Sequence, residues 1–261
     1  MGSAEVSQAV SKGIEAKRAF ENAPESVTYA SQVPVTALPA NRAVKINHLI
    51  GRAFEVKDFG SEVSGSASDV IAKLENQALD GDGAASYAIF LKLNNCDLLS
   101  QRQAKGSVPA EDSRLIEECE GLSAEDAVSG PKWLRLAAEQ GNIGAQLQYS
   151  MDSDRALGGP DALLRDPDAT TEYKQRATGY LESLAAQGSV DALLMLGNAY
   201  QVGVMMPEDL VLSRAYFDAV MRIDPSLVAG SRIGGLERSM SQQQLNEALA
   251  KGEKIYGSCC R

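Results

Sequence analysis

The sequence is poor in histidine and has no long apolar run. His48 is the only histidine among 261 residues. No stretch of about 18 uninterrupted apolar residues occurs, so we predict no transmembrane segment. A Ser-His-Asp triad or a zinc site of ordinary composition would have to centre on His48, which has no Cys, Asp or Glu four residues away on either side. We therefore predict no catalytic residue, no metal site and no cofactor.

Positive charge is also scarce. The chain has 25 Lys and Arg against 35 Asp and Glu, a net charge of −10. Nucleic-acid phosphates and anionic lipid surfaces are bound by basic patches, so we predict no nucleic-acid partner. The acidic surface of this chain would tolerate a basic protein or peptide better. Hydrophobic residues make up 44% of the chain, which is enough for a continuous core.

The four cysteines form two groups. Cys96 and Cys119 lie 23 residues apart, on either side of the polar insert 107–113. A disulfide between them would contribute about 3 kcal/mol in the chain-entropy model. Cys259 and Cys260 are adjacent, and three arrangements stay open for them: a bridge within the pair, a redox pair, or a cross-link that makes an oligomer. The alternative to the Cys96–Cys119 bridge is two buried thiols and a reactive C-terminal tail.

The cysteine count and the N-terminus bear on localisation. An even number of cysteines fits an oxidising compartment such as the periplasm. The chain opens with Met1-Gly2-Ser3, which is typical of residues added for expression. We expect a signal segment to have been removed, and we predict a periplasmic location.

The first part of the chain predicts a helical extension. Apolar residues recur at helical spacing over 4–22 and again over 41–56, so a helix is expected in each range. Residues 60–68 are rich in Gly and Ser and are typical of a linker. We therefore predict an N-terminal helical extension over residues 1–60 and a second domain over 61–261.

Three stretches of the second domain repeat one pattern. Residues 74–85, 134–145 and 181–192 each carry an apolar residue, an Ala four positions later, a Gly three after that and an Ala four further on. The Gly permits the backbone conformation that ends a helix, and the small Ala lets two helices approach closely. The pattern predicts paired helices, with insertions near 96–130 and 155–170. The expected helices cover 69–79, 84–95, 132–140, 143–151, 172–187, 190–202, 209–223 and 241–256.

The unit that begins at Tyr180 resembles the Sel1-like repeat, a relative of the tetratricopeptide repeat. The resemblance is carried by an AAxxG turn, an LGxxY element and a G-V-x-x-x-x-D loop: Ala185, Ala186, Gly188, Leu196, Gly197, Tyr200, Gly203, Val204 and Asp209. Gly188 and Asp224 are 36 residues apart, the usual length of such a unit. The resemblance implies an all-α fold, an α/α solenoid of Sel1-like helical hairpins.

The resemblance also implies a function class. Such a protein would be a non-catalytic scaffold or regulator in the bacterial cell envelope that binds a protein or peptide partner. One alternative is an immunity-type inhibitor of a toxin or effector. Another is a β-lactam-binding or hydrolysing enzyme of the cysteine-rich Sel1-like type, although four cysteines are too few for one disulfide in every repeat.

The repeat register also selects candidate contacts. Large apolar residues between hairpins are expected to be core. The residues expected to face a partner are five charged residues of the first helices, with three tyrosines as aromatic candidates for which a place in the core is the alternative: Lys132, Arg135, Glu139, Glu182, Arg222, Tyr149, Tyr200 and Tyr216.

Overall fold

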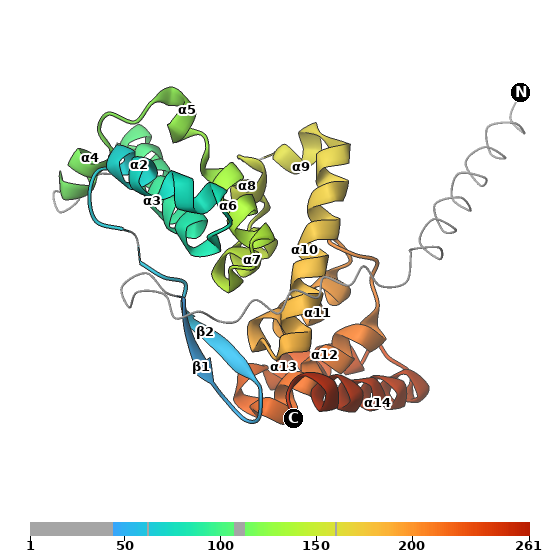
Figure 1. The fold of residues 1–261 in the computed structure, drawn as a ribbon. Coiled ribbons are helices and arrows are strands. Elements are labelled where there is room, and N and C mark those ends of the chain that lie inside the picture. The colour runs from blue at the N-terminus through green and yellow to red at the C-terminus, as the bar shows by residue number, and fades with distance from the viewer. Residues whose placement is uncertain (1–43, 62, 107–112, 160) are drawn as a thin grey trace, which may run out of the picture. The chain divides into compact units, whose positions relative to one another are not determined.

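Helices make up most of the computed structural model, which describes residues 44–61, 63–106, 113–159 and 161–261 (Figure 1). The helix predicted over 4–22 lies outside the described residues. The elements are β1 (Lys45–His48), β2 (Phe54–Asp58), α2 (Ala67–Leu79), α3 (Gly83–Ala104), α4 (Ser113–Cys119), α5 (Ala124–Ala127), α6 (Gly130–Glu139), α7 (Ile143–Met151), α8 (Ser153–Leu157), α9 (Ala162–Arg165), α10 (Pro167–Gln187), α11 (Val190–Val202), α12 (Leu210–Ile223), a 3-10 turn η2 (Pro225–Leu227), α13 (Gly230–Glu237) and α14 (Gln242–Cys259).

The long helices form a stack of hairpins. The order of packing is α2 on α3, α3 on α6, α6 on α7, α7 on α10, α10 on α11, α11 on α12, and α12 on α14. Each long helix therefore touches the long helix before it and the one after it, as in an α/α solenoid. The prediction of an all-α solenoid of helical hairpins is confirmed.

Local signals place the helix ends of the second and third hairpins. α7 and α11 begin and end where the sequence predicts, because Asn142 and Ser189 accept hydrogen bonds from the first-turn amides of Ala145 and Ala192. Gly188 ends α10 with φ 102°, a conformation that strains other residues. The repeat pattern therefore encodes these turns directly.

The two predicted insertions contain further helices. α3 continues to Ala104, so Cys96 lies inside it and not at the end of a shorter helix. α10 begins at Pro167 instead of residue 172, because Asp166 caps its first turn and Pro fits the first helical position. The insertions thus lengthen the repeat helices and add the short helices α4, α5, α8 and α9.

Residues 45–58 form an antiparallel β-hairpin, so the helix predicted over 41–56 is wrong. Within the extension predicted over residues 1–60, the described part is therefore not helical. The reason is tertiary, since the amides of Phe54 and Val56 donate to the carbonyl of Gly188 at 2.9 Å and the carboxylate of Asp191 at 2.8 Å. These partners are available only to an extended backbone.

The turn of the hairpin contacts the end of the chain. The amide of Arg52 donates to the carbonyl of Cys260 at 2.9 Å, and its guanidinium donates to the carbonyls of Arg261 and Ser258. Figure 1 shows the hairpin beside the C-terminus. This hairpin–C-terminus contact joins residues that are far apart in the sequence.

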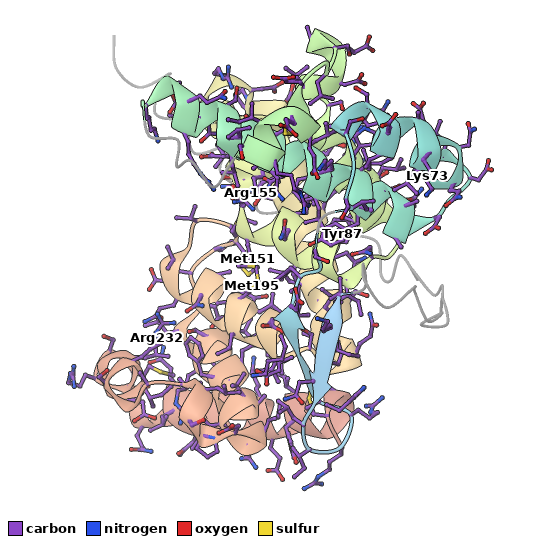
Figure 2. All side chains as sticks on the ribbon, turned by 90° about the vertical axis from the view of Figure 1, so that its left-hand side faces the viewer. Lys73, Tyr87, Met151, Arg155, Met195 and Arg232 are labelled. Atoms are coloured by element: carbon purple, nitrogen blue, oxygen red, sulfur yellow. A yellow bond between two sulfur atoms is a disulfide. The ribbon has the colours of Figure 1, made fainter. Side chains whose placement is uncertain are left out.

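Two groups of buried residues form the core. The first lies between α2, α3, α6, α7 and α10, with Trp133, Leu134 and Tyr173 among its members. The second lies between α10, α11, α12, α14 and the hairpin, with Leu193, Leu196 and Phe217. Figure 2 labels Met151 of α7 and Met195 of α11, two helices that contact each other.

The C-terminal helices pack tightly against α12. The sequence after Pro225 has a weak helical pattern, and it folds into the short helix α13 before α14 begins at a capping box formed by Ser241 and Gln244. From α13, Arg232 places its guanidinium carbon 5.6 Å from the centre of the Phe217 ring (Figure 2). α14 therefore occupies the position that a second helix of the last hairpin would have.

Candidate partner-binding face

Five of the six predicted partner-binding residues are exposed. Lys132, Arg135, Glu139, Glu182 and Arg222 reach solvent, but Tyr149 is only 2% exposed and does not contact a partner from the surface. Its ring packs between those of Tyr173 and Tyr180, at centroid distances of 5.3 and 5.6 Å. Burial raises the pKa of Tyr149 to about 12. Tyr149 is a core residue at the junction of α7 and α10.

Three of the exposed residues lie apart from one another. Lys132 places its ammonium 5.1 Å from the centre of the Trp133 ring. Arg222 pairs with Asp218 at 2.6 Å on the side of α12 that faces α14. Glu182 lies on α10. The structure thus does not gather all of the predicted residues into one surface.

An ion-pair network joins the exposed sides of α6 and α10. Arg176 pairs with Glu172 at 2.7 Å and with Glu139, and Glu139 lies 3.9 Å from Arg135. The hydrogen bond to Glu172 is the main cause of a raised pKa at Arg176, which also bonds the hydroxyl of Tyr180. Arg176 is not among the predicted residues, although its place one turn after Glu172 is a recognisable signal for a helix ion pair.

A second cluster lies where α10, α11 and α12 meet. The rings of Tyr200 and Tyr216 stack with centroids 5.8 Å apart and an interplanar angle of 9°. Burial raises the pKa of both tyrosines, to about 12 at Tyr216, and the nearby charge of Glu182 adds to both shifts. Both tyrosines are half-buried.

α10 contributes to both clusters, through Arg176 in the first and Glu182 in the second. It carries small residues, since Gly179, Ser183 and Ala186 are exposed, and a β-carbon added at Gly179 would meet no atom within 4 Å. We call the surface formed by these three residues with the two clusters the α10 face, whose other members are Arg135, Glu139, Arg176, Glu182, Tyr200 and Tyr216. A partner could approach the α10 backbone closely, with charged and aromatic side chains on both sides.

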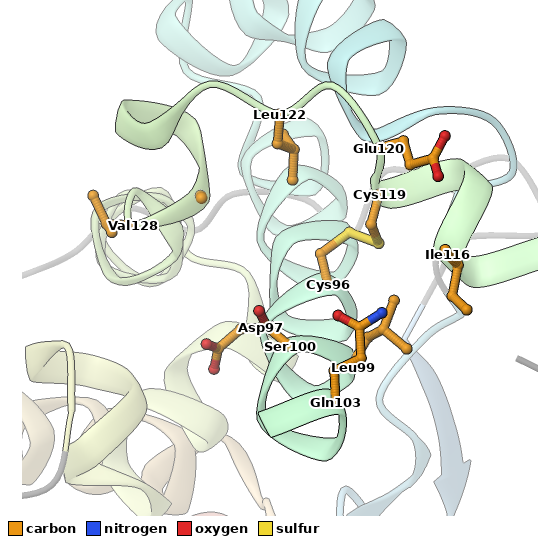
Figure 3. Close-up of a pocket in the computed structure, with 11 residues that line it drawn as sticks. Cys96, Asp97, Leu99, Ser100, Gln103, Ile116, Cys119, Glu120, Leu122 and Val128 are labelled. Atoms are coloured by element: carbon orange, nitrogen blue, oxygen red, sulfur yellow. A yellow bond between two sulfur atoms is a disulfide. The ribbon is translucent and has the colours of Figure 1, made fainter. Parts of the chain in front are cut away.

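A separate hollow of about 500 Å³ lies beside the first disulfide (Figure 3). Cys96 and Cys119 are bonded to each other, as the sequence predicts. The hollow is lined by Leu99, Ile116 and Leu122 around this bond, and by Val128, which is 76% exposed. The bond holds α4 against α3, and the walls of the hollow also carry the polar side chains of Asp97, Ser100, Gln103 and Glu120.

A buried ion pair accompanies that disulfide. Lys92 is fully buried in α3, and its ammonium contacts the carboxylate of Glu118 on α4. The hydrogen bond from Lys92 holds the pKa of Glu118 below its usual range, and Arg114 at 2.8 Å adds to the effect. This polar contact is a second link between the insertion and the repeat helices.

The C-terminal cysteines form a bond within their own pair. Cys259 and Cys260 are disulfide-bonded, and they are 1% and 0% exposed. Neither sulfur is therefore available to another chain, and the predicted oligomer through Cys259 or Cys260 does not fit this arrangement. The arrangement that the structure adopts is the bridge between the two adjacent residues.

Residues with catalytic or ligand potential lie apart from one another. His48 is exposed on β1, not on a helix. Within the described residues, no three His, Cys, Asp or Glu side chains gather in a way that could hold a metal ion. Ser129 and Lys132 have the Ser-x-x-Lys spacing of β-lactam nucleophiles. However, the Ser129 hydroxyl donates to the carbonyl of Asp126 at 2.8 Å, and the Lys132 ammonium lies over Trp133.

Comparison with known proteins finds similarity to a solved structure but to no family model. No family model matches the sequence, and no curated protein matches it. The chain is similar to a solved structure of a protective antigen present in uropathogenic Escherichia coli strains, which displays an SLR fold. The two share 19% identity at a TM-score of 0.42, and the match covers 73% of this chain and 41% of the antigen chain. This chain thus matches less than half of the length of that antigen.

Proposed function

We propose that this protein is a non-catalytic, Sel1-like repeat scaffold or regulator that binds a protein or peptide partner on its α10 face. The observation that carries the proposal is the arrangement of that face. Charged and aromatic side chains of α6, α11 and α12 lie near those of α10, which also exposes small residues. Helical repeat stacks present such continuous surfaces to other macromolecules.

The charge of the chain favours a basic partner. The net charge is −10, and an acidic surface attracts a cationic protein and speeds its association. On the α10 face, Glu182 has neither an ion pair nor a hydrogen bond within the described part of the chain. A partner with exposed Lys or Arg would complement it.

The cysteines support a location in the cell envelope. All four are in disulfides, which persist in oxidising compartments and are rare in the cytosol. We propose the bacterial periplasm as the compartment. Among the described helices, none is both long enough and apolar enough to cross a membrane.

A pull-down from a periplasmic extract tests the binding function. The wild-type chain should recover a stoichiometric protein, and a variant with Glu139→Ala and Arg176→Ala should lose it. The matched control is Glu247→Ala with Lys251→Ala, which removes an exposed ion pair of 3.1 Å on α14. Recovery of no stoichiometric protein, or equal recovery by both variants, would contradict the proposal.

The enzymatic alternative has its own assay. Nitrocefin is a chromogenic β-lactam, and a scaffold should leave it intact. Sustained turnover by the purified wild-type chain, lost in Ser129→Ala, would replace the non-catalytic function with a β-lactamase activity.

A further inference from the structure

Two successive repeat interfaces each carry a pair of tyrosine rings, edge-to-face at the first (85°) and nearly parallel at the second (9°). At the first interface, Tyr180 of α10 meets Tyr149 of α7, with ring centroids 5.6 Å apart. At the next interface, Tyr216 of α12 meets Tyr200 of α11 at 5.8 Å. Tyr216 follows Tyr180 by 36 residues, which is one repeat unit, so the two tyrosines occupy equivalent positions.

The first interface has its own guanidinium. Arg176 lies one turn before Tyr180, bonds its hydroxyl, and pairs with the carboxylates of Glu172 and Glu139. Its charge also lowers the pKa of Tyr149, against the larger effect of burial. Arg176 therefore links the carboxylates and the Tyr180 hydroxyl at this interface, and Arg135 adds a second cation 3.9 Å from Glu139.

The second interface has two tyrosines and a carboxylate, but it has no equivalent of Arg176. Leu212 stands one turn before Tyr216, at the position that Arg176 occupies relative to Tyr180. Glu182 adds negative charge near both tyrosines, and Asp209 adds more near Tyr200. Among the described residues, no Lys or Arg forms an ion pair with Glu182 or with Asp209.

The chemistry of the site matches a guanidinium group. A carboxylate accepts two parallel hydrogen bonds from arginine, and the planar guanidinium stacks on aromatic faces better than an ammonium does. A cation over a tyrosine face gains further attraction where water is partly excluded. Glu182 supplies the carboxylate, and the half-buried Tyr200 and Tyr216 supply the aromatic surface.

We propose that Glu182, Tyr200 and Tyr216 form a receptor for an arginine side chain of the partner. This proposal rests on the proposed binding function and names the partner group that the α10 face recognises. This arginine would contact Glu182, Tyr200 and Tyr216 as Arg176 contacts the carboxylates and Tyr180 at the preceding interface.

The test uses a minimal arginine peptide on the full chain. Acetyl-Gly-Arg-Gly-amide is titrated while the ring signals of Tyr200 and Tyr216 are followed by NMR, and the same peptide with neutral citrulline serves as ligand control. We expect saturable shifts of both rings with arginine only. Glu182→Gln should weaken binding about tenfold, because a charge-assisted pair becomes a neutral one. Glu253→Gln, an exposed carboxylate on α14, should leave binding unchanged.

A second variant fills the site from within the chain. Leu212→Arg places a guanidinium one turn before Tyr216, as Arg176 is placed before Tyr180, and it should abolish peptide binding. Equal shifts with arginine and citrulline, or unchanged binding in Glu182→Gln or in Leu212→Arg, would overturn the proposal.

The two proposals fail separately. If the peptide binds as expected but no protein is recovered from the periplasmic extract, the arginine site stands and the scaffold function is wrong. If a partner is recovered equally by Glu182→Gln and the wild-type chain, the function stands and the arginine site is wrong.

Discussion

A β-carbon added at Gly252 would lie 2.6 Å from the β-carbon of Asp218 and 2.9 Å from the carbonyl oxygen of Ala215. Gly252 therefore lets α14 approach α12 more closely than any other residue would. Asp218 cannot move freely, because it is buried and pairs with Arg222 at 2.6 Å and with Arg214 at 3.5 Å.

Replacing Gly252 should destabilise the protein. Gly252→Ala forces α14 away from α12, and overpacking of this kind costs about 1–3 kcal/mol. The matched control is Gly257→Ala on the same helix, where an added β-carbon meets no atom within 4 Å. The control should stabilise the protein by about 0.5–1 kcal/mol through helix propensity. Urea unfolding checks both values, and a stable Gly252→Ala would contradict the close packing.

The buried ion pair of Lys92 and Glu118 gives a second prediction. Glu118→Gln replaces the carboxylate beside a fully buried ammonium by a neutral amide and should cost about 3 kcal/mol of unfolding free energy. The double variant Lys92→Met with Glu118→Leu removes both charges and should recover most of that loss. Thermal and urea unfolding of the three chains provide the comparison, and a double variant less stable than Glu118→Gln would refute this account.

The bridge between Cys96 and Cys119 should contribute stability through the loop it closes. Replacing both cysteines by Ser should lower the unfolding free energy by about 3 kcal/mol, which is the chain-entropy value for a loop of this length. Hydrogen exchange should also become faster in α4, because the disulfide holds that helix to α3. A variant with unchanged stability and unchanged exchange would show that Lys92 and Glu118 suffice.

The raised tyrosine pKa values predict alkaline destabilisation. In the folded chain, burial raises the pKa of Tyr149 and of Tyr216 to about 12, whereas an unfolded tyrosine ionises near 10. The folded state therefore holds these protons more tightly, and this stabilisation is complete below about pH 10 and is lost as the pH rises toward 12. In Tyr149→Phe, the alkaline unfolding transition should move to higher pH, as followed by circular dichroism. The free energy of unfolding at pH 8 serves as the reference. A transition at the same pH in both chains would count against this cause.

The sequence predicts the hairpins well where the signal is local. α7 and α11 are found to the residue, because a capping side chain, a turn glycine and small packing residues all lie within the helices or next to them. The same local rules locate α14 through its cap at Ser241. The fold class was therefore predictable from the sequence.

The hairpin and the α10 face were not predictable to the same degree. Residues 45–58 have apolar spacing that also suits a helix, and the partners that select strands, Gly188, Asp191 and Cys260, are remote in the sequence. The repeat register correctly predicts that Glu182 is exposed. It does not predict that Tyr149 packs against Tyr173 and Tyr180. Which side of a helix meets the next unit depends on how the hairpins rotate against each other.

The hairpin–C-terminus contact has a consequence for how the protein unfolds. In a simple stack each unit touches only its neighbours, so units can be lost singly from one end. Here Arg52 contacts the end of α14, Phe54 contacts the α10–α11 turn, and Val44 packs against both core groups. Detaching α14 would remove partners from the hairpin and, through it, from a turn in the middle of the array. Unfolding of the C-terminal half should therefore be a single cooperative event instead of stepwise fraying.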